Sequence, residues 1–186
     1  MTRRLLTLLL VAFAALALGA CGNKTAKTLH GPTEGEYIDV GPLKYQVQIS
    51  RLLNPYDPED RGYLVDLPAG QSLGADGQWF GVFMRVENDG KGQAPTAQDY
   101  EIVDTQDNIY KPITMGPKNV FAYRATTLGA KQVLPQPDSS AAENTIQGAL
   151  LLFKIPNGNF ANRPLELRIT PPAGAGTEVG TIDLDV

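Results

Sequence analysis

Short runs of alternating apolar and polar residues, separated by glycine and proline, constrain the fold more than any other feature of this chain. Residues 43–50, 165–170 and 182–186 each place an apolar side chain at every second position. This period of two is typical of a strand with one buried face. No helical period continues for ten residues, so the sequence predicts an all-β fold.

Two other runs predict buried strands: the first is apolar on both faces at one end and predicts a central strand, and the second predicts another buried strand. Residues 78–88 place Phe80 and Val82 on one face and Phe83 on the other, and residues 148–156 are almost continuously apolar. A strand that is buried on both faces lies inside a sheet rather than at its edge. Asparagine and glycine follow the first run and proline ends the second, as expected where strands stop.

The aromatic residues of these strands are predicted to form the core. Tyr45, Tyr100 and Trp79 lie within strand-like runs, where aromatic side chains are usually buried. Phe153 and Val82 are predicted to share one core between two sheets, because each lies in a run with few charges.

Polar turns divide the rest of the chain into short elements. Residues 100–103 and 109–113 predict a hairpin, residues 54–60 an acidic loop with two prolines, and residues 63–67 a short edge strand. A body of about 150 residues buries nearly 70% of its unfolded surface, which is enough for one stable domain. The sequence therefore predicts an antiparallel β-sandwich of about seven strands over residues 38–186.

The N-terminus has the pattern of an export signal. Arg3 and Arg4 precede a 14-residue apolar run, residues 5–18, which is shorter than the roughly 20 residues that a bilayer span needs. The segment Leu18-Gly19-Ala20-Cys21 follows and resembles the lipobox of bacterial lipoproteins. The resemblance implies cleavage between Ala20 and Cys21 and attachment of lipid to the Cys21 sulfur.

These observations predict three parts. Residues 1–20 are a signal peptide, residues 21–37 are the lipidated cysteine and a flexible tether, and residues 38–186 are the sandwich. The predicted location is the extracytoplasmic face of a cell membrane, held by the lipid on Cys21. The sequence does not distinguish an inner from an outer membrane.

Charge and metal-binding residues exclude several classes of function. The 186 residues include 16 basic and 20 acidic side chains, and loss of the signal removes two basic ones, leaving a net charge of −6. This charge argues against binding to nucleic acid or to anionic lipid. Cys21 is the only cysteine and His30 the only histidine, so zinc and copper lack ligands and no cofactor is predicted.

Calcium is the remaining metal to consider. Carboxylates occur close together in residues 57–60 and 104–108, but neither group has the spacing of an EF-hand loop. Solvated loop acids and hairpin-turn residues account for both groups.

Two segments resemble a known family of domains. Residues 79–88 followed by 104–110, and residues 148–156 with their glycine, apolar run, phenylalanine and proline, are similar to telokin-like, immunoglobulin-like domains of uncharacterised bacterial lipoproteins. The resemblance covers residues 40–186 and implies the sandwich fold. It implies no activity.

No catalytic motif has the context that it requires. Residues 70–74, Gly-Gln-Ser-Leu-Gly, match the nucleophile-elbow pattern around Ser72. That motif needs a following helix and a later histidine, whereas turn residues follow and His30 lies upstream. The chain is therefore predicted not to be an enzyme.

The predicted function is a non-catalytic binding or interaction module on the membrane. Two alternatives stay open: a carrier with an apolar pocket of at least about 300 Å³ between the sheets, and a hydrolase that uses carboxylates alone. The partner could be an envelope protein, a glycan or a small ligand, in addition to the bilayer itself.

The predicted partner-binding surface is the acidic segment of residues 54–63. Pro55 and Pro58 restrict this loop, which lowers the entropy lost on binding. Tyrosines supply contact area and carboxylates attract a basic partner or a cation. The residues concerned are Tyr56, Asp57, Glu59, Asp60 and Tyr63.

Replacing the predicted lipid acceptor tests the anchor. Cys21→Ser should release the protein from membranes or leave the precursor uncleaved, because the sulfur that carries the lipid is gone. Membrane fractionation and the intact mass measure both outcomes. A Cys21→Ser protein that is processed and still sediments with membranes would show that the anchor lies elsewhere.

Overall fold

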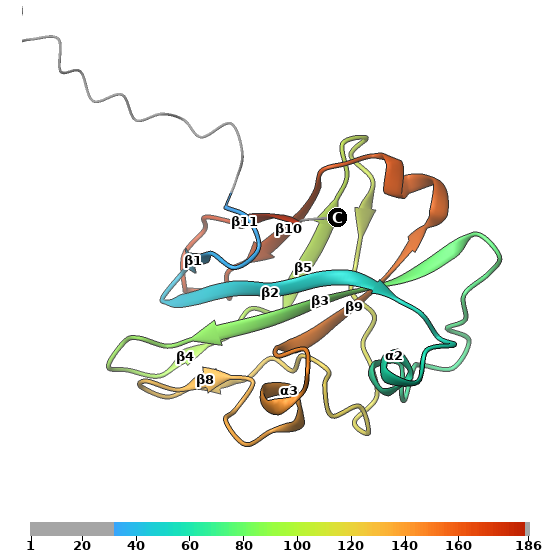
Figure 1. Cartoon of the computed structure of the whole chain (residues 1–186). Coiled ribbons are helices and arrows are strands. Elements are labelled where there is room, and N and C mark those ends of the chain that lie inside the picture. The colour runs from blue at the N-terminus through green and yellow to red at the C-terminus, as the bar shows by residue number, and fades with distance from the viewer. Residues whose placement is uncertain (1–31, 185–186) are drawn as a thin grey trace, which may run out of the picture.

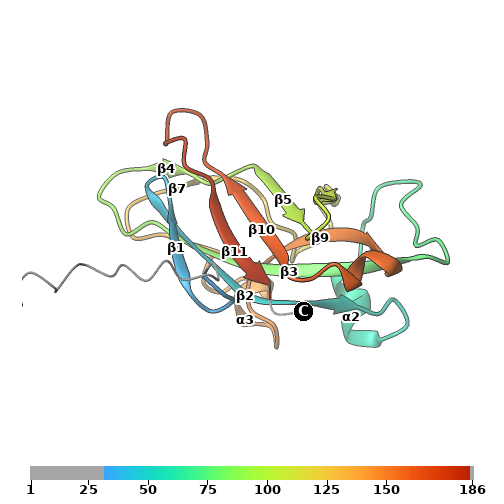
Figure 2. The same ribbon diagram turned by 90° about the horizontal axis from the view of Figure 1, so that it is seen from above.

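Two antiparallel sheets pack face to face in the computed structural model, which describes residues 32–184 (Figures 1 and 2). In sheet 1, β2 and β3 are neighbours, β1 pairs with β2, and both β8 and β9 pair with β3. Its strands are β1 (Tyr37–Val40), β2 (Leu43–Leu53), β3 (Gly77–Glu87), β8 (Val133–Leu134) and β9 (Ala149–Pro156).

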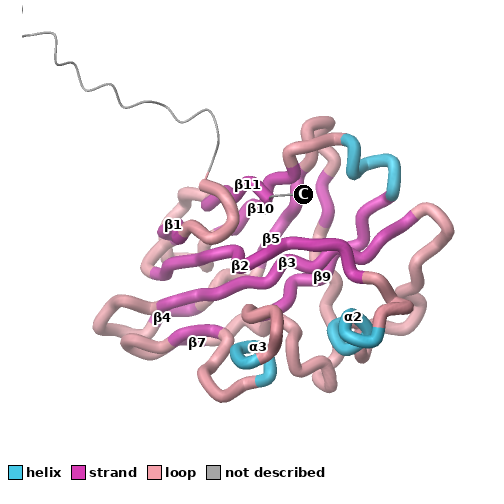
Figure 3. The backbone as a smooth tube through the Cα atoms, viewed as in Figure 1, coloured by secondary structure: helices cyan, strands magenta, loops and turns pink. Residues whose placement is uncertain are grey.

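Sheet 2 is shorter and has the order β11-β10-β5-β6. Its strands are β5 (Asp99–Val103), β6 (Ile109–Tyr110), β10 (Leu165–Thr170) and β11 (Gly180–Leu184), and a separate pair joins β4 (Ala94–Pro95) to β7 (Thr127–Leu128). Helical turns occur only as α2 (Pro58–Tyr63), α3 (Ser140–Glu143) and η2 (Asn157–Ala161) within residues 32–184 (Figure 3).

The predicted all-β antiparallel sandwich is confirmed. Among the eleven strands of the described residues, seven have four or more residues, which agrees with the predicted number. The predicted hairpin is present, because Ile102 and Val103 pair with Tyr110 and Ile109, but its second strand is only residues 109–110 and not 109–113.

The main core lies between the two sheets. Phe153 and Val82 are fully buried in this cluster, as predicted, and Tyr45 and Tyr100 are buried with them. Sheet 2 contributes the alternating apolar residues of its strands to the same core, namely Ile102, Leu165, Leu167, Ile169, Ile182 and Leu184.

A second apolar cluster covers the opposite face of β3 and β9. Trp79 and Phe83 of β3 and Leu150 and Leu152 of β9 are buried there under α2 and the loops around Met115. Strand β3 is therefore buried on both faces and has neighbours along both edges, which confirms its predicted central position.

One residue of β2 departs from the predicted alternation. Ile49 was expected on the buried face with Tyr45 and Val47, but it is 38% exposed. The register between β2 and β3 shifts between Val47 and Ile49, so an extra residue reverses the two faces from that point. Ser50 consequently takes the inward position and is 5% exposed.

The acidic segment after β2 contains a short helix where a loop and an edge strand were predicted. Asp57 is the N-cap of α2, and its carboxylate accepts hydrogen bonds from the backbone N–H groups of Glu59 and Asp60, at 2.8 and 3.2 Å. Pro58 occupies the first helical position, where its missing N–H costs nothing. Tyr63 ends this helix, and residues 64–67 form no strand.

The sandwich also begins earlier than residue 38. Gly35 donates its N–H to the Val47 oxygen in β2, and Asp183 in β11 donates to the Pro32 oxygen, both at 2.8 Å. Residues 32–37, assigned to the tether from sequence, therefore bond to both sheets. The predicted signal peptide, Ala20, Cys21 and His30 lie outside the described residues.

Truncating a core residue tests the packing between the sheets. Phe153→Ala should lower the free energy of unfolding by about 3–5 kcal/mol, through lost burial and the cavity left behind. Urea unfolding of the purified residue 22–186 fragment measures the change. Ile109→Ala, at a 57% exposed position of β6, is the matched control and should change the free energy by less than about 1 kcal/mol. Equal losses in the two variants would contradict this account of the core.

Candidate functional site

The loop between β2 and α2 displays one tyrosine almost completely to solvent. The Tyr56 side chain is 89% exposed. Its backbone N–H donates to Asn54 Oδ1 at 3.0 Å, and the Asp57 N–H donates to the Asn54 carbonyl oxygen at 3.0 Å. Pro55 lies between these two bonds, so the backbone that carries Tyr56 has little freedom.

An ion pair with a buried carboxylate holds the same loop to β2. Asp60 is 2% exposed, and Arg51 Nη2 lies 2.8 Å from its Oδ1 and 2.9 Å from its Oδ2. The same carboxylate accepts the Asn54 N–H at 2.7 Å. Asp60 therefore fixes the loop from inside and offers no carboxylate to an external partner.

Tyr63 also faces inward. Its ring makes edge-on contacts with Phe83 and Phe121, with ring centres 5.0 and 4.8 Å apart, and its hydroxyl accepts a hydrogen bond from Asn144 Nδ2 at 2.9 Å. Burial raises the pKa of this hydroxyl above its ordinary value. Of the five predicted partner-binding residues, Tyr56 and Glu59 are exposed and Asp57 is half-buried, while Asp60 and Tyr63 support them.

A shallow groove lies beside the exposed tyrosine. It has a volume of about 340 Å³ and is lined by Leu52, Pro55, Leu73 and Gln78, among others. Leu52 is 43% exposed, which is high for a leucine in a strand. Leu52, Pro55, Tyr56, Leu73 and Gln78 together are called the Tyr56 surface below.

The second group of acids serves the β5–β6 turn. Asp104 is 4% exposed, and its carboxylate accepts hydrogen bonds from the Asn108 side chain at 2.9 and 3.1 Å, from Asn162 Nδ2 at 3.0 Å and from the Tyr110 hydroxyl at 2.9 Å. The backbone N–H groups of Gln106 and Asn108 donate to Oδ1 as well. Hydrogen-bond donors of the protein itself occupy both carboxylate oxygens. Asp104 therefore stabilises the β5–β6 turn and leaves no oxygen for a metal ion. Within residues 32–184, no three His, Cys, Asp or Glu side chains are arranged to hold a metal.

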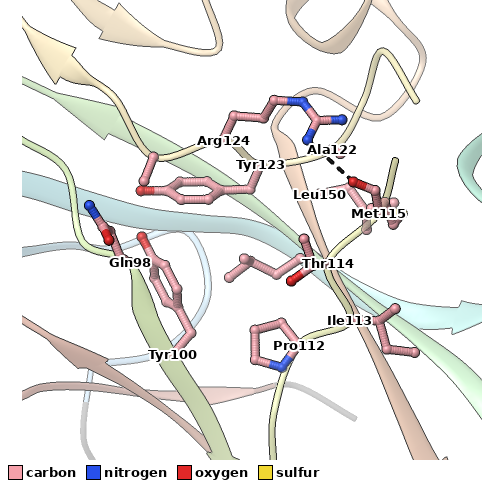
Figure 4. Close-up of a pocket in the computed structure, with 12 residues that line it drawn as sticks. Gln98, Tyr100, Pro112, Ile113, Thr114, Met115, Ala122, Tyr123, Arg124 and Leu150 are labelled. Carbon is pink, nitrogen blue, oxygen red and sulfur yellow. Dashed lines mark hydrogen bonds between the residues drawn. The ribbon is translucent and has the colours of Figure 1, made fainter. Parts of the chain in front are cut away.

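A small cavity opens where β6 stops pairing with β5 (Figure 4). The register that pairs Ile102 with Tyr110 brings Pro112 opposite Tyr100 two residues further on. Proline has no N–H to donate, so the ladder ends and the chain turns to pair Ile113 with Leu152 of β9. The space left has a volume of about 180 Å³.

The walls of this cavity differ in polarity. Apolar walls come from Pro112, Ile113, Met115, Ala122, Ala125, Leu150 and Leu151, and polar groups from Gln98, Tyr100, Thr114, Tyr123 and Arg124. Figure 4 shows the Tyr100 and Tyr123 rings on one side of the cavity and Pro112 and Thr114 on the other. Tyr100 was predicted to lie in the core. No sequence motif identifies the polar residues of this cavity as a group, because they come from segments that are far apart in the sequence.

Comparison with known proteins gives one structural match. A candidate lipoprotein, YcdA of Bacillus subtilis subsp. subtilis str. 168, has a crystal structure similar to this chain, with a TM-score of 0.49 and 13% sequence identity. The match covers 79% of this chain and 38% of YcdA, so the chain spans less than half of that protein's length. No family model and no curated protein sequence matches. Membership of the telokin-like family stays a prediction.

The described helices are too short and too polar to cross a bilayer.

The Asp104 network predicts a pH dependence of stability. Burial by itself would raise the pKa of Asp104, but hydrogen bonds from Asn108 and Asn162 outweigh it and hold the pKa well below its ordinary value. A lowered folded-state pKa adds stability above the unfolded value of about 4, and this stability is lost as the pH falls below it. The urea midpoint should therefore fall progressively as the pH is lowered below about 5.

Asp104→Asn isolates this contribution. At neutral pH the free energy of unfolding of the variant should be lower by about 1–3 kcal/mol. The amide N–H₂ of asparagine is itself a donor and cannot accept the hydrogen bonds that the carboxylate accepts. Its urea midpoint should change less with pH than that of the wild type. Asp107→Asn, at an exposed position of the same turn, is the control. If the urea midpoints of wild type and Asp104→Asn changed equally with pH, Asp104 would not be the source of the pH dependence.

Proposed function

We propose that the protein is a lipid-anchored envelope protein whose β-sandwich is a non-catalytic module for binding another protein. The lipobox-like segment at Cys21 supports the anchor and the export route. The observation that carries the binding role is the 89% exposure of Tyr56 on a backbone fixed by hydrogen bonds and by the Arg51–Asp60 pair.

The Tyr56 surface suits a protein partner for three reasons. A tyrosine provides a large contact area with few rotatable bonds, and a fixed loop loses little entropy on binding. Leu52 and Leu73 supply apolar area in the groove beside it. The exposed Glu59, three residues after Tyr56, favours a partner with basic residues.

The position of the surface fits presentation to such a partner. The chain enters the sandwich beside β11, whereas the Tyr56 loop follows the far end of β2, next to α2 (Figure 1). Between Cys21 and Pro32 lie ten residues, which span at most about 35 Å when fully extended. An anchored module would thus reach partners close to the membrane.

A carrier function has less support. The space between the two sheets is filled by the side chains of the main core. The cavity beside β5 has about 180 Å³, below the roughly 300 Å³ of typical small-molecule sites. The hollows of 340–430 Å³ are open grooves at the surface, formed by loops and by the ends of strands.

Site-specific crosslinking in cells tests the proposed surface. A photoreactive phenylalanine analogue at position 56 should give a discrete adduct, whereas the same analogue at Val179, a 43% exposed control on another loop, should not. Tyr56→Ala should abolish capture of the protein identified in that adduct and leave the melting temperature unchanged, because the side chain has few internal contacts. Identical adducts at both positions, or undiminished capture by Tyr56→Ala, would reject the surface.

A further inference from the structure

The outer edge of β2 is only partly covered by another strand. Along one side β2 pairs with β3 over residues 44–53, whereas on the other side β1 pairs with residues 43–46 alone (Figure 1). Main-chain N–H and C=O groups that stay unpaired at the edge of a sheet are a template for a further strand. The second half of β2 is therefore a place that can accept one.

Local contacts limit the unpaired part of this edge to a short stretch. Gly35 donates its N–H to the Val47 carbonyl oxygen at 2.8 Å, and the Glu34 carboxylate accepts the Ser50 N–H at 3.0 Å. Beyond the strand, a carboxylate of α2 accepts the Asn54 N–H at 2.7 Å. Residues 50–53, which lie between these contacts, are called the β2 edge below.

Leu52 presents both of its main-chain groups at the β2 edge. Alternate residues of an antiparallel strand direct their N–H and C=O groups to the same side. The Ser50 N–H points away from β3, toward Glu34, so the N–H and C=O of Leu52, two residues further on, point outward as well. No described residue bonds to these two groups on that side. Together with the Ser50 carbonyl oxygen, they offer one donor and two acceptors to an added strand.

The β2 edge lacks the usual protection of an exposed strand. Natural proteins block such edges with charged side chains or with proline. The one charged residue here, Arg51, is held by the Asp60 carboxylate at 2.8 Å, and Pro55 lies past the end of the strand. Leu52 is instead apolar and 43% exposed. An apolar side chain on an added strand, directly opposite Leu52, would cover it.

Negative charge lies at both ends of the β2 edge. Glu34 accepts the Ser50 N–H at one end, and the exposed Glu59 belongs to α2, which follows the other end. Opposite charges on two partners favour their association. This arrangement therefore favours a segment with basic residues beside its apolar ones.

We propose that the β2 edge binds an extended segment of the partner protein as an added antiparallel strand. An apolar residue of this segment pairs with Leu52: its N–H donates to the Leu52 carbonyl oxygen and its C=O accepts the Leu52 N–H. The N–H two residues further along the segment donates to the Ser50 carbonyl oxygen. The proposal rests on the function proposed above in one respect, that the segment belongs to the protein that contacts Tyr56.

The peptide acetyl-Lys-Val-Lys-Val-Lys-amide tests the β2 edge. Titrated into isotope-labelled protein (residues 22–186), it should give saturable NMR shifts of the Leu52 amide and slow the hydrogen exchange of that amide severalfold. Recognition of this kind depends mainly on main-chain hydrogen bonds, so a simple alternating sequence is a suitable probe. Absence of saturable shifts at Leu52 would overturn the proposal.

Methylated forms of the peptide are the matched controls. N-methyl groups on both valines remove the two N–H donors that face β2 and leave the charge unchanged, so this form should bind about tenfold more weakly. An N-methyl group on the central lysine faces away from β2 and should leave binding unchanged. Equal binding of the peptide with methylated valines would show that main-chain pairing is absent and would overturn the proposal.

Leu52→Pro removes the outward N–H from the protein. Proline is tolerated at a sheet edge where the N–H would face solvent, so the variant should stay folded and bind the peptide about tenfold more weakly. Leu52→Ala keeps the N–H and should bind more tightly than Leu52→Pro. Equal binding by the two variants would contradict the pairing. If Leu52→Pro does not fold, the comparison of the methylated peptides decides the proposal.

Hydrogen exchange of the free protein identifies other occupants of the edge. The Leu52 amide should exchange freely without peptide. Protection in the free monomer would show that another part of this chain covers the edge, and protection that appears with dimers in sedimentation would assign it to a second copy. Either result would overturn the proposal.

The crosslinking at position 56 is read separately. An adduct at position 56 without peptide binding would reject the β2 edge and keep the Tyr56 surface. Peptide binding without that adduct would support the β2 edge as a strand-binding site and reject the function proposed for Tyr56.

Discussion

Burial of β3 on both faces is the constraint on which the rest of the structure depends. One face of this strand packs against sheet 2, and the other, with Trp79 and Phe83, would be left in water without a further layer. Apolar area of this size costs about 25 cal/mol per Å² when exposed. The loops on that side are therefore structural parts of the domain, although they contain little regular secondary structure (Figure 3).

Buried polar side chains hold these covering loops in place. Asn119 is 2% exposed and donates to the carbonyl oxygens of Tyr63 and Val65, while its Oδ1 accepts the N–H groups of Phe121 and Ala122. One amide thus satisfies four backbone groups from two loops, which strand pairing would satisfy in a regular sheet. Tyr63 of α2 belongs to the second core, so this core holds α2, which directly follows the Tyr56 loop, against β3.

Side-chain pattern was sufficient for the sheets and insufficient for the sites. The apolar runs of β3 and β9 identify strands that are buried on both faces. β3 is central, whereas β9 pairs with β3 alone among the named strands and has only isolated bridges on its other edge. The bulge that exposes Ile49 adds a single residue to β2. The alternation of apolar and polar residues in the sequence continues unchanged through it, so the sequence gives no sign of the bulge. Helix α2 did have a signal, Asp57 followed by Pro58 at the N-cap and N1 positions. The cavity beside Tyr100 had no such sequence signal, because the residues that line it come from segments far apart in the sequence.

The bonds of residues 32–36 to β2 and β11 have a mechanical consequence. Tension applied to the chain at Pro32 reaches sheet 1 through the Gly35–Val47 bond and sheet 2 through the Pro32–Asp183 bond. A pull on this segment therefore loads sheet 2 first and sheet 1 next, so both sheets bear part of it. If a domain is held to a surface by its N-terminus, force enters it through that end of the chain. In this domain the entry point is hydrogen-bonded to both sheets.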